Sequence, residues 1–165
     1  MSWMIHESKG RIWCKDMAKP NNQIIFKGWN YPSKSWVEGG VVTINGQYYI
    51  VQARLNIFSC LGNSDIDVKF VEVIRESICP YIGFSDQLGT KIFSNDIITV
   101  DNKTYIGVVK QGVYNTDWDA QAGHCGFYIE WQNRSGLRKD LGFWVNQRDI
   151  AVVGNVFDSK ELLRW

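Results

Sequence analysis

A stretch near the middle of the chain restricts the possible folds more than any other feature. Residues 72–100 read EVIRESICPYIGFSDQLGTKIFSNDIITV, so two β-rich runs and two turn-forming clusters share one short segment. The first cluster, residues 86–89, matches a type I turn, because aspartate suits the first position of that turn and glycine suits the fourth. The segment therefore predicts strands joined by tight turns, with little slack between them.

The second cluster in this segment, residues 94–96, also predicts a tight turn. Asn95 is one of the few non-glycine residues that tolerate a left-handed backbone. We expect Asp86 and Asp96 to accept hydrogen bonds from backbone amides within their own turns. A catalytic pair of carboxylates is the alternative, although the sequence places no histidine or metal-ligand cluster beside them.

Two β-hairpins and the lack of a long amphipathic helix indicate an all-β fold. Residues 41–51 read VVTI-NG-QYYIV, and Asn45-Gly46 is the preferred composition of a type I′ hairpin turn. A second hairpin is expected over residues 96–109, around the turn at 101–103. The alternation in 66–74 predicts a strand but does not settle which of its sides is buried. Further strands are expected at 23–29, from 35, at 126–131 and at 149–153.

The remaining segments set the expected domain organisation. We interpret residues 1–22 as an N-terminal extension and residues 23–165 as one β domain. Residues 111–124 resemble a loop, and residues 137–147 are left unassigned. Asp158, followed three residues later by Glu161, resembles a capping box and predicts a short C-terminal helix.

Charge and hydrophobicity limit the classes of partner. The net charge is +1, and residues 1–40 contain six basic and three acidic residues, which is either a weak basic patch or an ordinary solvated surface. Proteins that grip duplex DNA tightly usually carry a larger basic footprint, so tight duplex binding is not expected. No apolar run approaches the ~18 residues of a membrane span.

The cysteines are expected to be free thiols in a cytoplasmic protein. Residues 1–10 carry charges and lack the apolar segment of a signal peptide. In a reducing compartment, disulfides are rare and a lone cysteine usually packs as a small hydrophobic residue. The chain contains Cys14, Cys60, Cys79 and Cys125, with no closely spaced pair.

Two further groups of residues are candidates for chemistry or recognition. His124-Cys125, beside Asp117 and Asp119, could bind a metal or form a nucleophilic pair, but only the first two are adjacent and His6 is the only other histidine. We expect no metal site and no cofactor there, and interpret the segment as a polar loop before a buried cysteine. Exposed aromatic rings could stack on single-stranded bases; the tryptophans to examine are Trp29, Trp36, Trp131 and Trp144.

Three motifs give the chain a resemblance to a known family. Upstream are Phe26-Lys27-Gly28 and Trp36-Val37-Glu38-Gly39, and downstream is VGNVFDSKELL at residues 153–163. In their order and spacing these segments resemble the YopX family of phage and prophage proteins. Departures fall at Cys79-Pro80, Ile82 and Asn95, and residues 1–22 and 111–147 match nothing in the pattern. The residues of the central segment that stand in the family's register are Glu76, Tyr81, Gly83, Asp86, Gly89, Ile92, Phe93, Asp96 and Ile97.

The resemblance implies an all-β architecture with SH3-like barrel or roll elements and a phage or prophage origin. It brings no catalytic residue and no cofactor to this chain. We therefore expect a non-enzymatic accessory protein, a small β-barrel interaction module whose partner is a host or phage protein. The first alternative is a nucleic-acid-binding module, for single strands rather than duplex. The least favoured alternative is a metal-dependent hydrolase or nuclease built on Asp117, Asp119 and His124.

Overall fold

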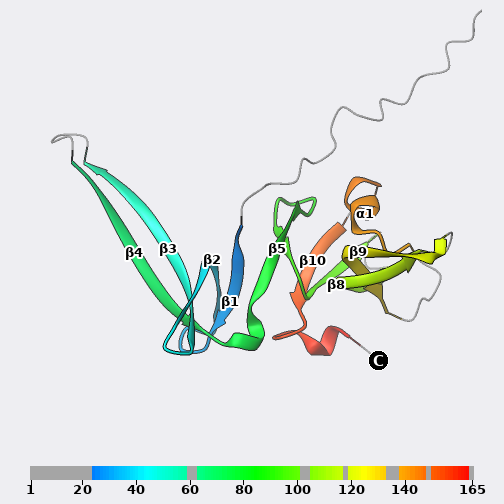
Figure 1. Cartoon of the computed structure of the whole chain (residues 1–165), viewed down its shortest axis with the longest axis horizontal. Coiled ribbons are helices and arrows are strands. Elements are labelled where there is room, and N and C mark those ends of the chain that lie inside the picture. Colours follow the sequence, from blue (N-terminus) through cyan, green and yellow to red (C-terminus); the bar gives the residue numbers. More distant parts are fainter. Residues whose placement is uncertain are drawn as a thin grey trace, which may run out of the picture.

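The computed structural model describes residues 24–58, 63–100, 105–116, 119–132, 138–147 and 150–163. Within these residues the strands form two antiparallel sheets, so the all-β prediction is confirmed (Figure 1). The first sheet has the order β4-β3-β2-β1-β5-β6, and the second has the order β10-β7-β8-β9. The strands are β1 (Phe26–Asn30), β2 (Ser35–Ile44), β3 (Gln47–Phe58), β4 (Asn63–Val73), β5 (Cys79–Ser85), β6 (Lys91–Phe93), β7 (Asp96–Val100), β8 (Tyr105–Thr116), β9 (Asp119–Trp131) and β10 (Ile150–Asn155).

The predicted turns and hairpins are present. Asn45 and Gly46 have φ angles of 51° and 82°, as a type I′ turn requires, and they join β2 to β3. Strands β7 and β8 pair as the second predicted hairpin, although its turn at 101–104 lies outside the described residues. Asn95 has a φ of 63°, and the Gly89 amide donates to the Asp86 carbonyl at 3.0 Å.

The described residues of the segment 111–124, namely 111–116 and 119–124, are strand rather than loop, so that prediction was wrong. Strand β8 continues to Thr116 and β9 begins at Asp119. Gly112 pairs directly with Gly126 across the two strands, and these glycines obscured the period-two pattern in the sequence. The main-chain ladder between two long strands stabilises a segment whose own residues have little preference for strand.

The helical segments also differ from expectation. A short helix, α1 (Leu141–Gln147), lies in the segment left unassigned, and it buries Leu141 and Trp144. The expected C-terminal helix is a single 3-10 turn, η2 (Lys160–Leu162), with no side-chain cap. Asp158 does not cap it, because its carboxylate accepts a hydrogen bond from the Trp36 indole N–H at 2.8 Å.

The first sheet curls, but among the described residues its two outer strands do not pair with each other. The Ile74 amide donates to the Trp29 carbonyl at 3.0 Å, so the chain reaches β1 as it leaves β4, just before the 3-10 turn η1 (Arg75–Ser77). In the part of the chain that the structure describes, β4 and β6 remain the outer strands of this sheet. Among the described residues the strand pairings therefore close no barrel, and only the all-β class of the expected fold is confirmed.

Two motif glycines are explained by close packing inside this curl. A Cβ at Gly39 would stand 2.2 Å from the Val51 carbonyl oxygen, and one at Gly28 would stand 2.9 Å from the Val73 side chain. No side chain fits where backbones approach this closely.

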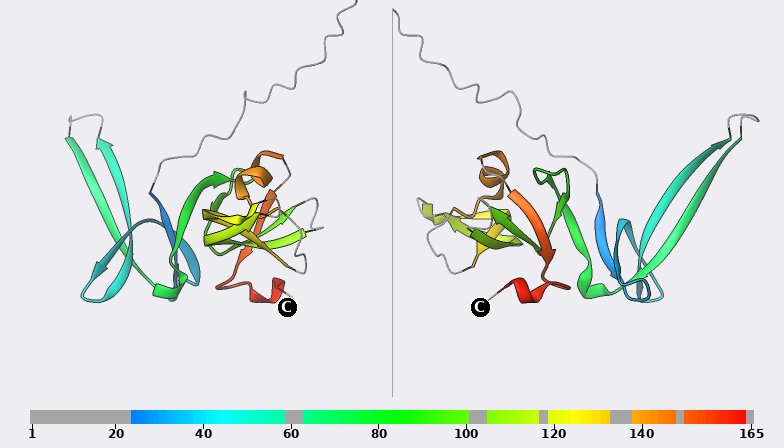
Figure 2. Two further views of the ribbon diagram at one scale, coloured as in Figure 1. Left: turned by 45° about the vertical axis from the view of Figure 1, so that its right-hand side comes forward. Right: turned by 180° about the vertical axis from the view of Figure 1, so that it is seen from behind.

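Strands β3 and β4 extend past the rest of the first sheet as a two-stranded ribbon. We call this ribbon, residues 51–58 and 63–70, the arm. In Figures 1 and 2 the arm points away from the second sheet in every view. The compact hydrophobic core lies in the second half of the fold, where β5–β10 and α1 bury Ile82, Ile92, Ile98, Val100, Val109, Ile129, Trp131, Leu141, Trp144 and Ile150.

Candidate functional site

A buried polar cluster joins the two sheets. Lys27 of β1 and Asp96 of β7 form an ion pair through Nζ and Oδ1. The Asp96 carboxylate also accepts hydrogen bonds from the Phe93 amide at 2.8 Å and from Asn155 Nδ2 at 2.9 Å. We call Lys27, Cys79, Asp96 and Asn155 the junction network, because its members come from β1, β5, β7 and β10.

The electrostatics of the junction network point to a structural role. Burial raises the pKa of Asp96, while Lys27, Asn155 and the Phe93 amide act in the opposite direction. The Lys27 ammonium also lies 4.6 Å from the centre of the Trp36 ring and 4.9 Å from that of Phe93, where cation–π attraction replaces part of its hydration. Both carboxylate oxygens of Asp96 are occupied and the residue is fully buried, so no substrate can reach it.

Cys79 in this network is a poor nucleophile. Its sulfur lies 3.8 Å from the Nδ2 atoms of Asn95 and Asn155, and burial raises the pKa of the thiol. The thiolate is the reactive form of cysteine, so a raised pKa suppresses reactivity. The free thiols predicted for Cys79 and Cys125 are confirmed, whereas Cys14 and Cys60 lie outside the described residues.

The prediction for the two aspartates is confirmed, and each has an additional long-range contact. Asp86 accepts hydrogen bonds from the amides of Leu88 at 2.9 Å and Thr90 at 2.8 Å. It also accepts one from the Val152 amide of β10 at 3.1 Å. Asp86 therefore attaches its turn to the second sheet through Val152. Asp96 likewise attaches its turn to the first sheet through Lys27.

The residues around His124 do not assemble into a metal site in the part of the chain that is described. His124 and Cys125 are neighbours on β9, so their side chains point to opposite faces of the strand. Among the described residues, no group of three or more His, Cys, Asp or Glu could hold a metal ion. Asp117, His6 and the side chain of Asp119 lie outside the described residues.

The four tryptophans selected from the sequence pack against other side chains. Trp131 and Trp144 are buried, and both indole N–H groups donate to the Arg138 carbonyl, at 2.8 and 2.6 Å. Trp29 and Trp36 are half-buried and meet edge to face at 5.4 Å, with Phe157 about equally close to both. These rings serve packing.

A different set of aromatic rings lies along the β8–β9 hairpin. The rings of Tyr114 and Tyr128 stack with their centres 5.2 Å apart, and the centre of the His124 ring lies 5.6 Å from that of Tyr114. Burial raises the pKa of the Tyr114 phenol, and nearby Asp140 adds to that effect. We call Tyr114, His124 and Tyr128 the ring ladder. The ring ladder was not predicted, because the sequence of residues 111–124 resembles a loop.

The arm carries the candidate binding surface. On its exposed side the exposed fractions are 62% for Ile66, 45% for Val68 and 52% for Phe70. Cross-strand pairing places Val51 opposite Phe70 and Ala53 opposite Val68, so one side of the ribbon is continuously apolar. Ile44 of β2, 43% exposed, extends the same side. We call these six residues the apolar face.

The exposure of the apolar face shows which side of the segment 66–74 is buried, a point that the alternation in its sequence did not settle. The side with Val68 and Phe70 faces solvent, whereas the other side buries Ile50 and Val73 at the base of the arm. Farther along, that second side carries Asp67 and Lys69. The alternation was visible in the sequence, but burial depends on where the curled sheet ends, which no local pattern contains.

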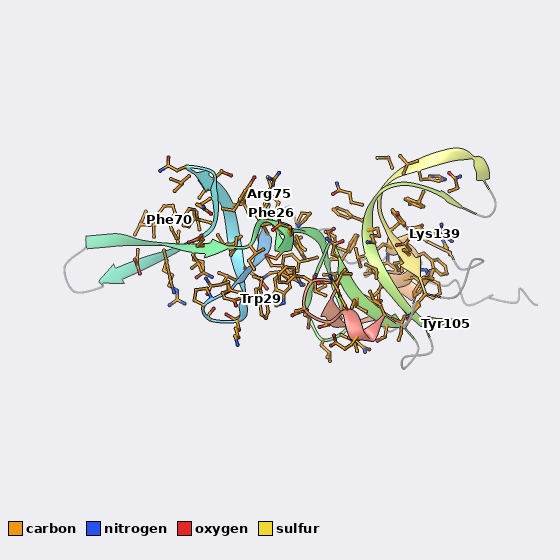
Figure 3. The ribbon with its side chains drawn as sticks, turned by 90° about the horizontal axis from the view of Figure 1, so that it is seen from below. Phe26, Trp29, Phe70, Arg75, Tyr105 and Lys139 are labelled. Atoms are coloured by element: carbon orange, nitrogen blue, oxygen red, sulfur yellow. The ribbon has the colours of Figure 1, made fainter. Side chains whose placement is uncertain are left out.

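A hollow of about 750 Å³ lies at the base of the arm. Arg75 and Tyr48 line it, with the guanidinium carbon 5.5 Å from the ring centre, and Glu72 and Glu76 add carboxylates. Figure 3 shows Arg75 at the base of the arm and Phe70 farther along it. The hollow therefore lies at the base of the arm, whereas Ile66, Val68 and Phe70 of the apolar face lie farther along it.

Comparison with known proteins gives the family of the chain. A model of the YopX family, described as YopX protein, matches residues 25–164. The chain belongs to the YopX family. The three motifs that carried the resemblance each supply one member of the junction network: Lys27 from the first, Asp96 from the second and Asn155 from the third. In this YopX chain the family pattern thus reflects one buried contact between the two sheets.

Other comparisons add little to the family assignment. The crystal structure of protein EF1440 from Enterococcus faecalis is similar, with a TM-score of 0.46 and 17% sequence identity, covering 86% of this chain and 99% of that one. A comparison with curated proteins gave no match. Within the described residues, no helix combines the length and apolar character needed to cross a membrane.

Proposed function

We propose that this YopX protein is a non-enzymatic accessory protein of phage or prophage origin that acts in the host cytoplasm as a protein-interaction module. The observation that supports the proposal is the apolar face of the arm. Contiguous apolar patches on a protein surface usually mark interaction sites. The partner is a host or phage protein with an apolar surface complementary to Ile66, Val68 and Phe70.

The shape and chemistry of the arm favour recognition over catalysis. The arm stands clear of the second sheet (Figure 2), so a partner can reach its apolar face without displacing other elements. Phe70 supplies an aromatic anchor of the kind enriched in protein interfaces. In contrast, the aspartates Asp86 and Asp96 are occupied by main-chain amides.

Capture of a partner from infected or lysogenic host cells tests this function. With the tagged full chain as bait, Phe70→Ser is expected to reduce the recovered partner about tenfold or more, because it removes the largest apolar contact of the face. Val113→Ser is the matched control, since Val113 is 71% exposed but lies on β8. Equal recovery with Phe70→Ser, or equal loss with Val113→Ser, would contradict the proposal.

The ring ladder favours a second candidate function, binding of single-stranded nucleic acid. Bases stack on aromatic side chains with about 1–3 kcal/mol per base, and this contribution needs no net positive charge. The stacked pair of Tyr114 and Tyr128 is the observation that supports this candidate.

A salt titration with labelled oligonucleotides separates the two candidates. With a net charge of +1, few phosphates can be neutralised, so we expect no tight duplex binding at physiological salt. If single strands bind through the ring ladder, Tyr114→Ala should abolish that binding while Tyr31→Ala, a control at an exposed turn, leaves it unchanged. Submicromolar duplex binding that survives about 150 mM salt would replace the interaction module with a nucleic-acid-binding module.

A further inference from the structure

Strand β4 is the outer strand of the first sheet, and its free edge has a defined orientation. The Glu72 carbonyl accepts a hydrogen bond from Asn30 Nδ2 at 2.8 Å, so the main-chain groups of Glu72 point away from β3. In an antiparallel ladder these directions alternate along a strand. The main-chain N–H and C=O groups of Ile66, Val68 and Phe70 therefore point outward from the edge.

The side chains along this edge are complementary to a second copy of themselves. If two β4 strands pair antiparallel about Val68, Ile66 of each copy stands opposite Phe70 of the other. On the opposite side of the ribbon, Asp67 of each copy stands opposite Lys69 of the other, at a non-hydrogen-bonded pair where side chains are closest. Both charges are exposed, and neither belongs to an ion pair of the described residues.

The register about Val68 places both charges of each copy opposite a charge of the other sign. Moving the axis by one residue to Asp67 or to Lys69 places like charges directly opposite each other, which is destabilising. Charges on an edge strand normally prevent association with other strands. Here two opposite charges flank a central valine, so they stabilise pairing about Val68 and oppose a direct Asp67–Asp67 or Lys69–Lys69 pair. That charge complementarity singles out a second copy of the chain as the occupant.

We propose that two copies of this protein associate through β4, antiparallel about a two-fold axis at Val68. Ile66, Val68 and Phe70 exchange main-chain hydrogen bonds with the partner copy, and pairing stops near Glu72, whose carbonyl is already bound by Asn30. Such an interface is isologous, the commonest arrangement in oligomers. The two apolar faces then lie on the same side of one continuous sheet. This association goes beyond the proposed function, because it requires no other protein.

Sedimentation velocity of the full chain over a concentration series tests the proposal through charge exchange. Wild type is expected to pass from one-chain to two-chain mass as concentration rises. D67K and K69D each place like charges across the interface and should weaken association about tenfold or more. An equimolar mixture of the two variants pairs a doubly positive edge with a doubly negative one and should restore the two-chain mass. The double variant D67K/K69D should restore it as well.

Controls distinguish a lost interface from a lost fold. Circular dichroism should be unchanged in every variant, and K160E alters an exposed charge far from β4 and should associate as wild type. V68P removes an outward-pointing amide and offers an independent disruption of the edge. A wild type that stays at one-chain mass, single variants that associate normally, or a mixture that does not recover would each overturn the proposal. Partner capture that still depends on Phe70 in K69D would leave the proposed function standing.

Discussion

Replacing Lys27 with methionine is expected to lower the free energy of unfolding by about 3–5 kcal/mol, the usual cost of removing one partner of a buried ion pair. The variant leaves the Asp96 carboxylate fully buried beside Asn155 with no neutralising charge. Methionine is similar in length to lysine, so the loss reports the charge rather than a cavity. Urea unfolding followed by circular dichroism measures it.

Two further variants distinguish the cost of breaking this buried ion pair from the cost of breaking an exposed one. Lys91→Met removes the pair with Glu38, 2.7 Å apart but with both side chains more than one-third exposed, and such pairs contribute about 0–1 kcal/mol. The double variant K27M/D96L replaces both buried charges and should recover part of the stability. If K27M costs no more than Lys91→Met, the junction network does not hold the two sheets together.

Trp144→Ala is expected to destabilise the protein by about 3–5 kcal/mol, as truncation of a large buried aromatic residue usually does. Trp144 attaches α1 to the second sheet, because its ring meets that of Trp131 edge to face at 5.0 Å. Its indole N–H donates to the Arg138 carbonyl at 2.6 Å. The variant therefore loses packing and leaves a buried acceptor with one partner fewer.

Thermal unfolding compares this variant with a neighbour on the same helix. Asn146→Ala changes an exposed side chain and should cost about 0.5 kcal/mol. A mild effect of Trp144→Ala, equal to that of Asn146→Ala, would mean that α1 contributes little to the stability of the core.

The features that local chemistry determines were predictable from the sequence. The turns at Asn45-Gly46 and Asn95 depend on residues that tolerate positive φ, and both have it. Asp86 was correctly expected to bind its own turn, but its bond to the Val152 amide, 66 residues away, was not. The β8–β9 hairpin was missed because Gly112 and Gly126 face each other across the ladder, a compensation that appears only when the strands are paired.

The candidate site was less predictable, because it depends on where the sheet ends. The alternation of Ile66, Val68 and Phe70 with charged residues was visible in the sequence. That pattern was compatible with burial of either side of the strand. The Lys27–Asp96 contact could not be predicted either. The two residues belong to separate motifs, and no local sequence pattern indicates that these motifs meet in the fold. Surface exposure and long-range pairing both arise from the curl of the first sheet, which itself requires the close approach at Gly39.

The separation of Lys27 and Asp96 along the chain has a consequence for folding kinetics. The two residues are 69 positions apart, so closing the loop between them early would cost chain entropy before other contacts could repay it. We therefore expect the ion pair to form late in folding, after the strands that carry it are in place. Contacts absent from the transition state slow unfolding and leave the folding rate nearly unchanged. We expect this pair to lower the unfolding rate and so to lengthen the lifetime of the native state.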